Sequence, residues 1–225
     1  MISQLAIKNK LLIILLTFAL YNKAFSQEAA VQAKGLYSSD FIIDGIPRYI
    51  NFYIPDGFGK KDIYPLMIIL HEEGENSKLL IKKYGDKIRQ LADSSGCIVL
   101  YPDAVKGHWN GRITNAGADT INDVGFLNIM IDYFIQQYHC DDSRVYATGF
   151  YNGGEMAWRL GCSLSAKITA IAPFIVSQQA AAKTCTPSAK IEIFNTERFL
   201  LPPPKKFAFS AITSAWNFLL MQSRK

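Results

Sequence analysis

The stretch that decides the fold is Arg144-Val-Tyr-Ala-Thr-Gly-Phe-Tyr-Asn-Gly-Gly-Glu-Met-Ala157. Its first half is rich in β-formers, its second half favours a helix, and Gly149 and Gly153 lie on either side of the junction. This is the strand, turn and helix layout of a nucleophile elbow, a turn so tight that side chains at the flanking positions would clash. The central side chain of such a turn projects above a sheet at a helix N-terminus. In this chain the central residue is Tyr151, where the motif G-x-S-x-G has a serine.

The segments around this turn alternate between strands and helices. Asp44-Gly45 lies between two β-rich runs within residues 41–54 and predicts a hairpin. Further apolar runs predict strands at 66–70, 97–101, 144–148, 168–176 and 191–194, and helical periodicity predicts helices at 77–94, 124–138, 153–164 and 208–221. The pattern predicts an α/β protein with a mainly parallel sheet, an N-terminal antiparallel hairpin and helices on both faces. Ligands of such sheets bind at the carboxyl ends of the strands.

The N-terminal segment has the features of an export signal. Lys8 and Lys10 precede the apolar run 11–20, and Ala24-Phe-Ser26 supplies small residues for a signal peptidase. We therefore expect residues 1–26 to be cleaved, leaving 27–225 as a single domain that is secreted or periplasmic and has no membrane span. An uncleaved anchor and a buried core helix are the alternatives. The net charge of +5 over 225 residues is spread along the chain, which argues against a nucleic-acid partner.

The four cysteines lie in a chain that is expected to be exported, where disulfides persist. Sequence alone leaves three full pairings open, and the pairing of Cys97 and Cys140 is undetermined. Cys162 and Cys185, which flank one predicted strand, are the preferred disulfide. The absence of a C-x-x-C pair argues against a structural zinc site or a thioredoxin-like centre.

An acidic cluster follows the predicted strand 66–70 and consists of Glu72, Glu73 and Glu75 beside His71. It lacks the second histidine of H-E-x-x-H. We expect a solvated acidic loop, with weak calcium binding as the alternative. No metal centre and no cofactor are predicted.

Several segments together resemble the secreted polyhydroxybutyrate depolymerase and feruloyl esterase group of α/β-hydrolases. They occur in that group's order and cover most of residues 40–200. The segments are Arg48-Tyr49, Pro65-Leu-Met-Ile-Ile-Leu-His71, Gly96-Cys-Ile-Val-Leu-Tyr-Pro-Asp103, Trp109-Asn110, Asp123-Val-Gly-Phe126, Asp142-Ser-Arg-Val-Tyr-Ala-Thr-Gly149, Asn152-Gly-Gly-Glu-Met-Ala157, and Cys162 with Cys185. The resemblance implies an α/β-hydrolase fold and the hydrolysis of carboxylic esters through a serine, a histidine and an aspartate.

The triad that the resemblance implies is not found at the matching positions. The nucleophilic serine corresponds to Tyr151, and the acid corresponds to Arg198 in Phe194-Asn-Thr-Glu-Arg198. His71, His108 and His139 all precede the elbow, whereas the family's histidine follows the last helix. The C-terminal end is expected to be shortened relative to the family, so that the helix at 208–221 must cover a sheet edge.

The sequence therefore favours a degenerate hydrolase that binds a ligand or a partner in the former active-site cleft. The predicted binding residues are His71, Glu72, Trp109, Asn110, Tyr151 and Asn152. An ester, a saccharide or a phenolic compound is the expected small-molecule ligand, and Trp109 is a candidate aromatic platform. An active ester hydrolase with an unorthodox site around Tyr151 is the alternative, and an eroded gene product is a third reading.

Overall fold

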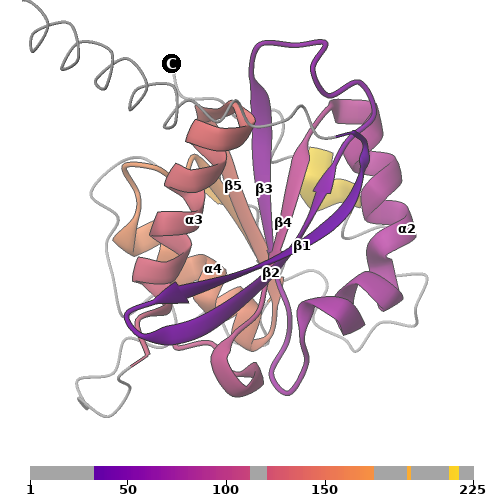
Figure 1. The fold of residues 1–225 in the computed structure, drawn as a ribbon. Coiled ribbons are helices and arrows are strands. Elements are labelled where there is room, and N and C mark those ends of the chain that lie inside the picture. The colour runs from indigo at the N-terminus through magenta and orange to yellow at the C-terminus, as the bar shows by residue number, and fades with distance from the viewer. Residues whose placement is uncertain (1–32, 112–120, 175–191, 194–212, 218–225) are drawn as a thin grey trace, which may run out of the picture. The chain divides into compact units, whose positions relative to one another are not determined.

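The computed structural model describes residues 33–111, 121–174, 192–193 and 213–217 (Figure 1). Ala33–Lys225 forms one compact unit, and the description below concerns that unit. Three of the predictions, the export signal at 1–26, Cys185 and Arg198, lie outside the described residues.

The predicted N-terminal hairpin is confirmed. Strands β1 (Gly35–Ile43) and β2 (Ile46–Ile54) pair antiparallel from Ile43 opposite Ile46 to Gly35 opposite Ile54. The two turn residues, Asp44 and Gly45, have φ angles of 54° and 75°. Positive φ at both central positions is what a two-residue hairpin turn requires, and Asp-Gly is among the pairs that tolerate it best.

The sheet has seven strands in the order β1-β2-β4-β3-β5-β6-β7. Strands β1, β2 and β4 pair antiparallel, whereas every pairing from β4 through β3, β5, β6 and β7 is parallel. The bounds of the parallel strands are β3 (Tyr64–Leu70), β4 (Ile98–Pro102), β5 (Cys140–Phe150), β6 (Ala170–Phe174) and β7 (Glu192–Ile193). The mainly parallel sheet with an antiparallel N-terminal hairpin is thus as predicted.

The helices begin and end close to their predicted positions. They are α2 (Ser77–Ser95), α3 (Asp123–Tyr138) and α4 (Asn152–Ser163), with a short 3-10 turn η1 at Val105–Gly107. Asn76 caps α2, because its side chain accepts a hydrogen bond from Leu79 N. Asn122 caps α3, because its side chain accepts a hydrogen bond from Gly125 N, and this leaves the Asp123 carboxylate for other contacts.

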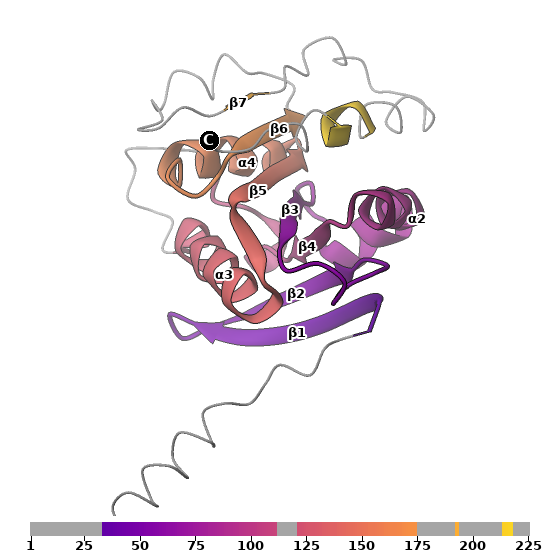
Figure 2. The ribbon, with the colours of Figure 1, turned by 90° about the horizontal axis from the view of Figure 1, so that it is seen from above.

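Helices cover both faces of the sheet (Figure 2). On one face, α3 and α4 pack against the sheet through residues such as Phe126, Phe134 and Leu160. On the other face, α2 packs together with the helical segment 213–217, whose Ala215 and Trp216 are buried. Each fully buried large apolar side chain contributes about 1.5–3 kcal/mol. The described part of the C-terminal helix therefore packs on a face of the sheet, whereas we expected it at an edge.

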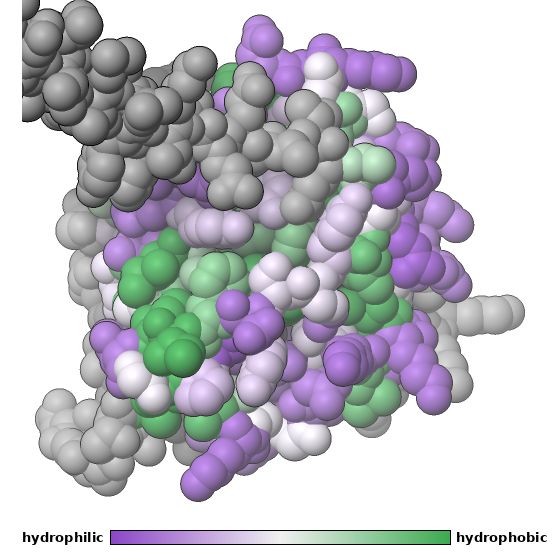
Figure 3. All heavy atoms as spheres, viewed as in Figure 1, coloured by the Kyte–Doolittle hydropathy of each residue, from purple (hydrophilic) through white to green (hydrophobic). Residues whose placement is uncertain are grey.

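The outer surface of the hairpin carries apolar side chains. Ile42 is 79% exposed, and Tyr49 is also exposed. In Figure 3 apolar side chains gather over the hairpin and the adjacent α3, between hydrophilic ones. Among the described residues, no helix is long and apolar enough to cross a membrane.

Two of the four cysteines are free thiols. Cys97 and Cys140 are both buried, and burial raises the pKa of each thiol. A raised pKa keeps a thiol protonated and unreactive at neutral pH. The Cys162–Cys185 disulfide stays a prediction, since Cys185 lies outside the described residues.

Candidate functional site

The elbow lies at the carboxyl end of β5, where the chain turns directly into α4. Tyr151 occupies the turn with φ 48° and ψ −113°, a conformation that a bulky residue rarely adopts. Such a conformation costs about 1–3 kcal/mol and persists only where the surroundings enforce it. Two backbone bonds hold it: Tyr151 N donates to Phe174 O at 2.7 Å, and Glu155 N donates to Tyr151 O at 2.9 Å.

The glycines beside Tyr151 are sterically required. A Cβ atom on Gly149 would lie 2.5 Å from the carbonyl carbon of Gly153. A Cβ atom on Gly153 would lie 2.5 Å from Leu70 O and closer still to His71 O. The end of β3 therefore packs directly against the start of α4, as the sequence motif predicts for a nucleophile elbow.

The side chain of Tyr151 is 46% exposed. Sequence allowed two roles for this ring, which could either fill the vacated serine pocket or contact a ligand. A ring that is nearly half exposed does not fill an interior pocket. Its surface is open to solvent at the tip of the elbow.

A buried polar network lies directly beneath the elbow. The side chain of Asn152 accepts a hydrogen bond from Trp109 N at 2.7 Å and donates one to Trp109 O at 2.9 Å. Trp109 Nε1 donates to His71 O at 3.1 Å, which ties the loop after β4 to the end of β3. The network therefore fastens both neighbouring loops to the first residue of α4.

The ring of His71 uses both of its nitrogens within the protein. Ala104 N donates to Nε2 at 3.0 Å, so Nδ1 carries the proton and donates to Glu72 O at 2.9 Å. Burial lowers the pKa of His71, which favours this neutral form. His71 therefore holds the loops that follow β3 and β4 in place.

A second part of the network reaches the hairpin. Arg48 Nη2 pairs with Asp123 Oδ1 at 2.6 Å, with side chains 2% and 0% exposed, and the guanidinium lies 4.4 Å from the centre of the Phe126 ring. Asp123 Oδ2 accepts from Asn110 N at 2.8 Å. The ion pair thus anchors the loop that carries Trp109 and Asn110.

These contacts correct part of the predicted binding surface. His71 and Trp109 are fully buried, and Asn152 is buried with its amide engaged by Trp109. Trp109 therefore does not provide the aromatic platform that its sequence context suggested. Asn110 is half-buried and hydrogen-bonded to Arg159. Of the six predicted binding residues, Tyr151 is exposed and Glu72 is partly exposed.

The acidic loop after β3 is less isolated than the sequence implied. Lys83 from α2 bonds Glu72 at 3.0 Å and also bonds Glu75. Burial, opposed by Lys83 and reinforced by Glu72, raises the pKa of Glu75. Glu73 pairs with His108 at 3.0 Å. Among the described residues, no group of three or more His, Cys, Asp or Glu side chains is arranged to hold a metal ion.

Sequence reasoning missed a stack of aromatic rings beside the elbow. Phe150 and Phe174, at the ends of β5 and β6, stack with ring centres 5.1 Å apart and planes 19° apart. Tyr84 from α2 stacks on Phe150 at 5.6 Å and 22°. Phe150 and Phe174 each end an apolar strand, which was a usable signal, but nothing local indicated that Tyr84 would join them.

Comparisons with known proteins agree with this architecture. No protein-family model matches the chain. A bifunctional acetylxylan esterase/xylanase, XynS20E, from Neocallimastix patriciarum is 29% identical over 129 residues, which are 57% of this chain and 18% of that protein. Feruloyl esterase D from Neurospora crassa is 26% identical over 141 residues, which are 58% of this chain and 46% of that protein. The match spans less than half the length of each relative.

A solved structure of a ferulic acid esterase superposes with a TM-score of 0.59 over 84% of this chain and 98% of that one, at 13% identity. At this identity the likeness concerns the fold alone. Together with the elbow, it defines the chain as an α/β-hydrolase-type protein. Within that class, the relatives that the chain resembles in sequence are acetylxylan and feruloyl esterases.

Proposed function

We propose that this chain is an exported, catalytically degenerate relative of the feruloyl and acetylxylan esterases that binds a small molecule at the elbow. The observation that carries the proposal is Tyr151: it stands at the tip of the elbow, where the motif has serine, and its ring is 46% exposed. An exposed ring at the carboxyl end of a parallel sheet supplies binding surface in the place where such sheets bind ligands.

The chemistry around Tyr151 supports a role without turnover. An unperturbed phenol has a pKa of about 10 and needs an adjacent base to act as a nucleophile near neutral pH. His71 cannot serve, because its Nε2 already accepts the Ala104 N–H. Glu72 and Glu75 also place negative charge beside the position where an oxyanion would develop, although Lys83 offsets part of it.

A second candidate function is ester hydrolysis at Tyr151, and one observation favours it. His108 Nδ1 lies 3.0 Å from Glu73 Oε1, on the loops that follow β4 and β3. A carboxylate that holds Nδ1 leaves Nε2 able to accept a proton. In this route the Tyr151 oxygen attacks the acyl carbon, His108 takes the phenolic proton and gives it to the leaving alkoxide, and water then releases the acid from Tyr151.

The two candidate functions differ in whether the protein hydrolyses esters. The purified protein is assayed with p-nitrophenyl acetate and methyl ferulate beside Tyr151→Phe and His108→Gln. Our proposal predicts that all three proteins hydrolyse these esters at the same background rate. A wild-type rate that both substitutions abolish would establish the second function and overturn the first.

A further inference from the structure

Three rings beside the elbow, Tyr84, Phe150 and Phe174, form a stack, and together with the neighbouring Tyr151 we call them the aromatic ledge. Tyr84, Phe150 and Phe174 are stacked nearly parallel and each is half-buried, so part of every ring is open. Tyr151 follows Phe150 directly, and its N–H bonds the carbonyl of Phe174. Near-parallel stacking is a favoured packing of aromatic rings, and a further planar ring can extend it.

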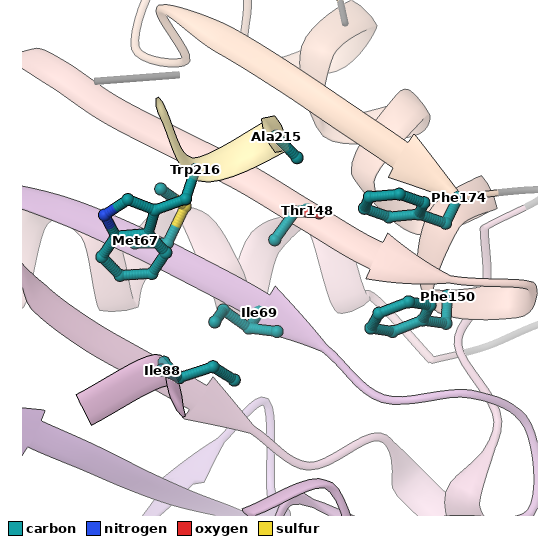
Figure 4. Close-up of a pocket in the computed structure, with 8 residues that line it drawn as sticks. All are labelled: Met67, Ile69, Ile88, Thr148, Phe150, Phe174, Ala215 and Trp216. Carbon is teal, nitrogen blue, oxygen red and sulfur yellow. The ribbon is translucent and has the colours of Figure 1, made fainter. Parts of the chain in front are cut away.

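Behind the ledge lies an apolar pocket (Figure 4). Phe150 and Phe174 lie side by side at one end of it, and Ile69, Thr148, Ala215 and Trp216 line the rest. The Thr148 hydroxyl is already used, because it donates to Ala172 O at 2.6 Å. The residues around the pocket are therefore apolar apart from Thr148.

The charges beside the ledge are unbalanced. Lys83 bridges two carboxylates, Glu72 and Glu75, so this cluster keeps one excess negative charge. Lys83 directly precedes Tyr84 on α2, so its ion pairs with Glu72 and Glu75 place the cluster beside the ledge.

The N-terminus of α4 opposes this negative charge, because it carries partial positive charge. A helix N-terminus is equivalent to about half a positive charge and favours an anion. The one excess carboxylate at the Lys83 cluster exceeds that half charge. The described surroundings of the ledge are therefore net negative.

Building on the proposed binding function, we infer that the aromatic ledge binds an aromatic group that is neutral or positively charged and discriminates against aromatic carboxylates. Ring stacking supplies the contact, and Glu72 serves as acceptor for a hydroxyl or ammonium group of the ligand. A unit charge about 6 Å from one uncompensated carboxylate changes affinity by about fivefold at a dielectric between those of water and the protein surface. The ligand class is thus set by charge as well as by shape.

Three probes with the same p-hydroxyphenyl ring test this inference: tyramine as the cation, 4-ethylphenol as the neutral compound and 4-hydroxyphenylacetate as the anion. Their dissociation constants are measured by NMR titration of the purified protein at pH 7 and low salt. We expect tyramine to bind at least about fivefold more tightly than 4-hydroxyphenylacetate, with 4-ethylphenol between them. The difference should shrink in 0.5 M NaCl, where the screening length falls below the charge separation.

Substitutions test the charged part and the aromatic part of the site separately. Glu72→Gln should remove most of the charge preference, because the neutral amide brings the dissociation constants of tyramine and 4-hydroxyphenylacetate together. Asp142→Asn is the matched control, because it removes an exposed carboxylate at the amino-terminal end of β5 and should change nothing. Tyr151→Ala should weaken the binding of all three probes. Phe150→Leu provides a second test of the ring stack.

The outcomes also separate this inference from the proposed function. Equal affinities, or tightest binding of 4-hydroxyphenylacetate, would overturn the charge preference while leaving binding at the elbow intact. Failure of all three probes to bind would overturn the ledge as an aromatic site. Ester turnover that depends on Tyr151 would overturn the proposed function and leave the charge preference standing.

Discussion

The residues beneath the elbow differ from those above it in burial and in hydrogen bonding. Below, the Arg48–Asp123 ion pair and the hydrogen bonds among His71, Trp109 and Asn152 are buried and hold the loops in place. Above, Tyr151 and the acidic loop are exposed or half-exposed.

Segments that resemble the esterases supply the buried network, whereas Tyr151, which stands where the motif has serine, lies on the exposed rim above it. A buried scaffold can thus hold the elbow with a tyrosine at its tip. Because the scaffold and the rim share few groups, they respond to different substitutions.

The largest expected effect comes from breaking the buried ion pair. Asp123→Asn leaves the Arg48 guanidinium buried without its counter-charge and should lower the free energy of unfolding by about 3–5 kcal/mol. Asp132→Asn is the matched control on the same helix, because Asp132 pairs with Lys167 near the surface and should lose at most about 1 kcal/mol. Urea unfolding of both variants measures the difference. Similar, small losses would show that the ion pair does not anchor the scaffold.

A smaller loss is expected when a methyl group is forced between β3 and α4. Gly153→Ala should destabilise the fold by about 2–3 kcal/mol, because its Cβ would overlap backbone carbonyl oxygens that cannot move freely. Gly74→Ala, where no atom lies within 4 Å of the added Cβ but φ is 75°, should cost only about 1–2 kcal/mol. If Gly153→Ala proved the milder change in thermal or urea unfolding, the close approach at the elbow would be refuted.

A still smaller change in folding stability is expected from Glu75 on the rim, and this change depends on pH. The pKa of Glu75 is raised in the folded protein, mainly by burial, so the folded state binds more protons than the unfolded state from about pH 4.5 up to the raised pKa. The contribution of Glu75 to stability is therefore fully present below that window and declines as the pH rises through it.

Glu75→Gln should remove this decline, so the variant gains stability relative to the wild type as the pH rises through the window. Chemical unfolding at a series of pH values measures the difference between the two proteins. A gap that stays constant across the series, or that widens in favour of the wild type, would contradict the assignment.

The sequence predicted the fold well, because each strand and helix has a local signal. The Asp44-Gly45 turn, the apolar strand 66–70 and the glycine-flanked elbow all form where their residues indicate. The site was predicted less well. Sequence shows that Trp109 and Asn152 lie near the elbow, but not that their polar groups face each other inside the protein.

The parts that escaped prediction depend on contacts between distant segments. Lys83 reaches the acidic loop from one side of α2, and Tyr84 reaches Phe150 from the next position along the helix. Both contacts depend on how α2 is rotated against the sheet, which its apolar periodicity fixes only approximately. Side-chain partners across elements therefore required the structure.

We infer that the scaffold presents an elbow without a working nucleophile, and covalent labelling can detect such a nucleophile. The purified protein is incubated with a fluorophosphonate, with Tyr151→Phe as the control, and intact mass and peptide mapping locate any adduct. We predict that the wild-type protein remains unlabelled at the elbow. A stoichiometric adduct on Tyr151 that is absent from Tyr151→Phe would contradict the claim and identify an active hydrolase.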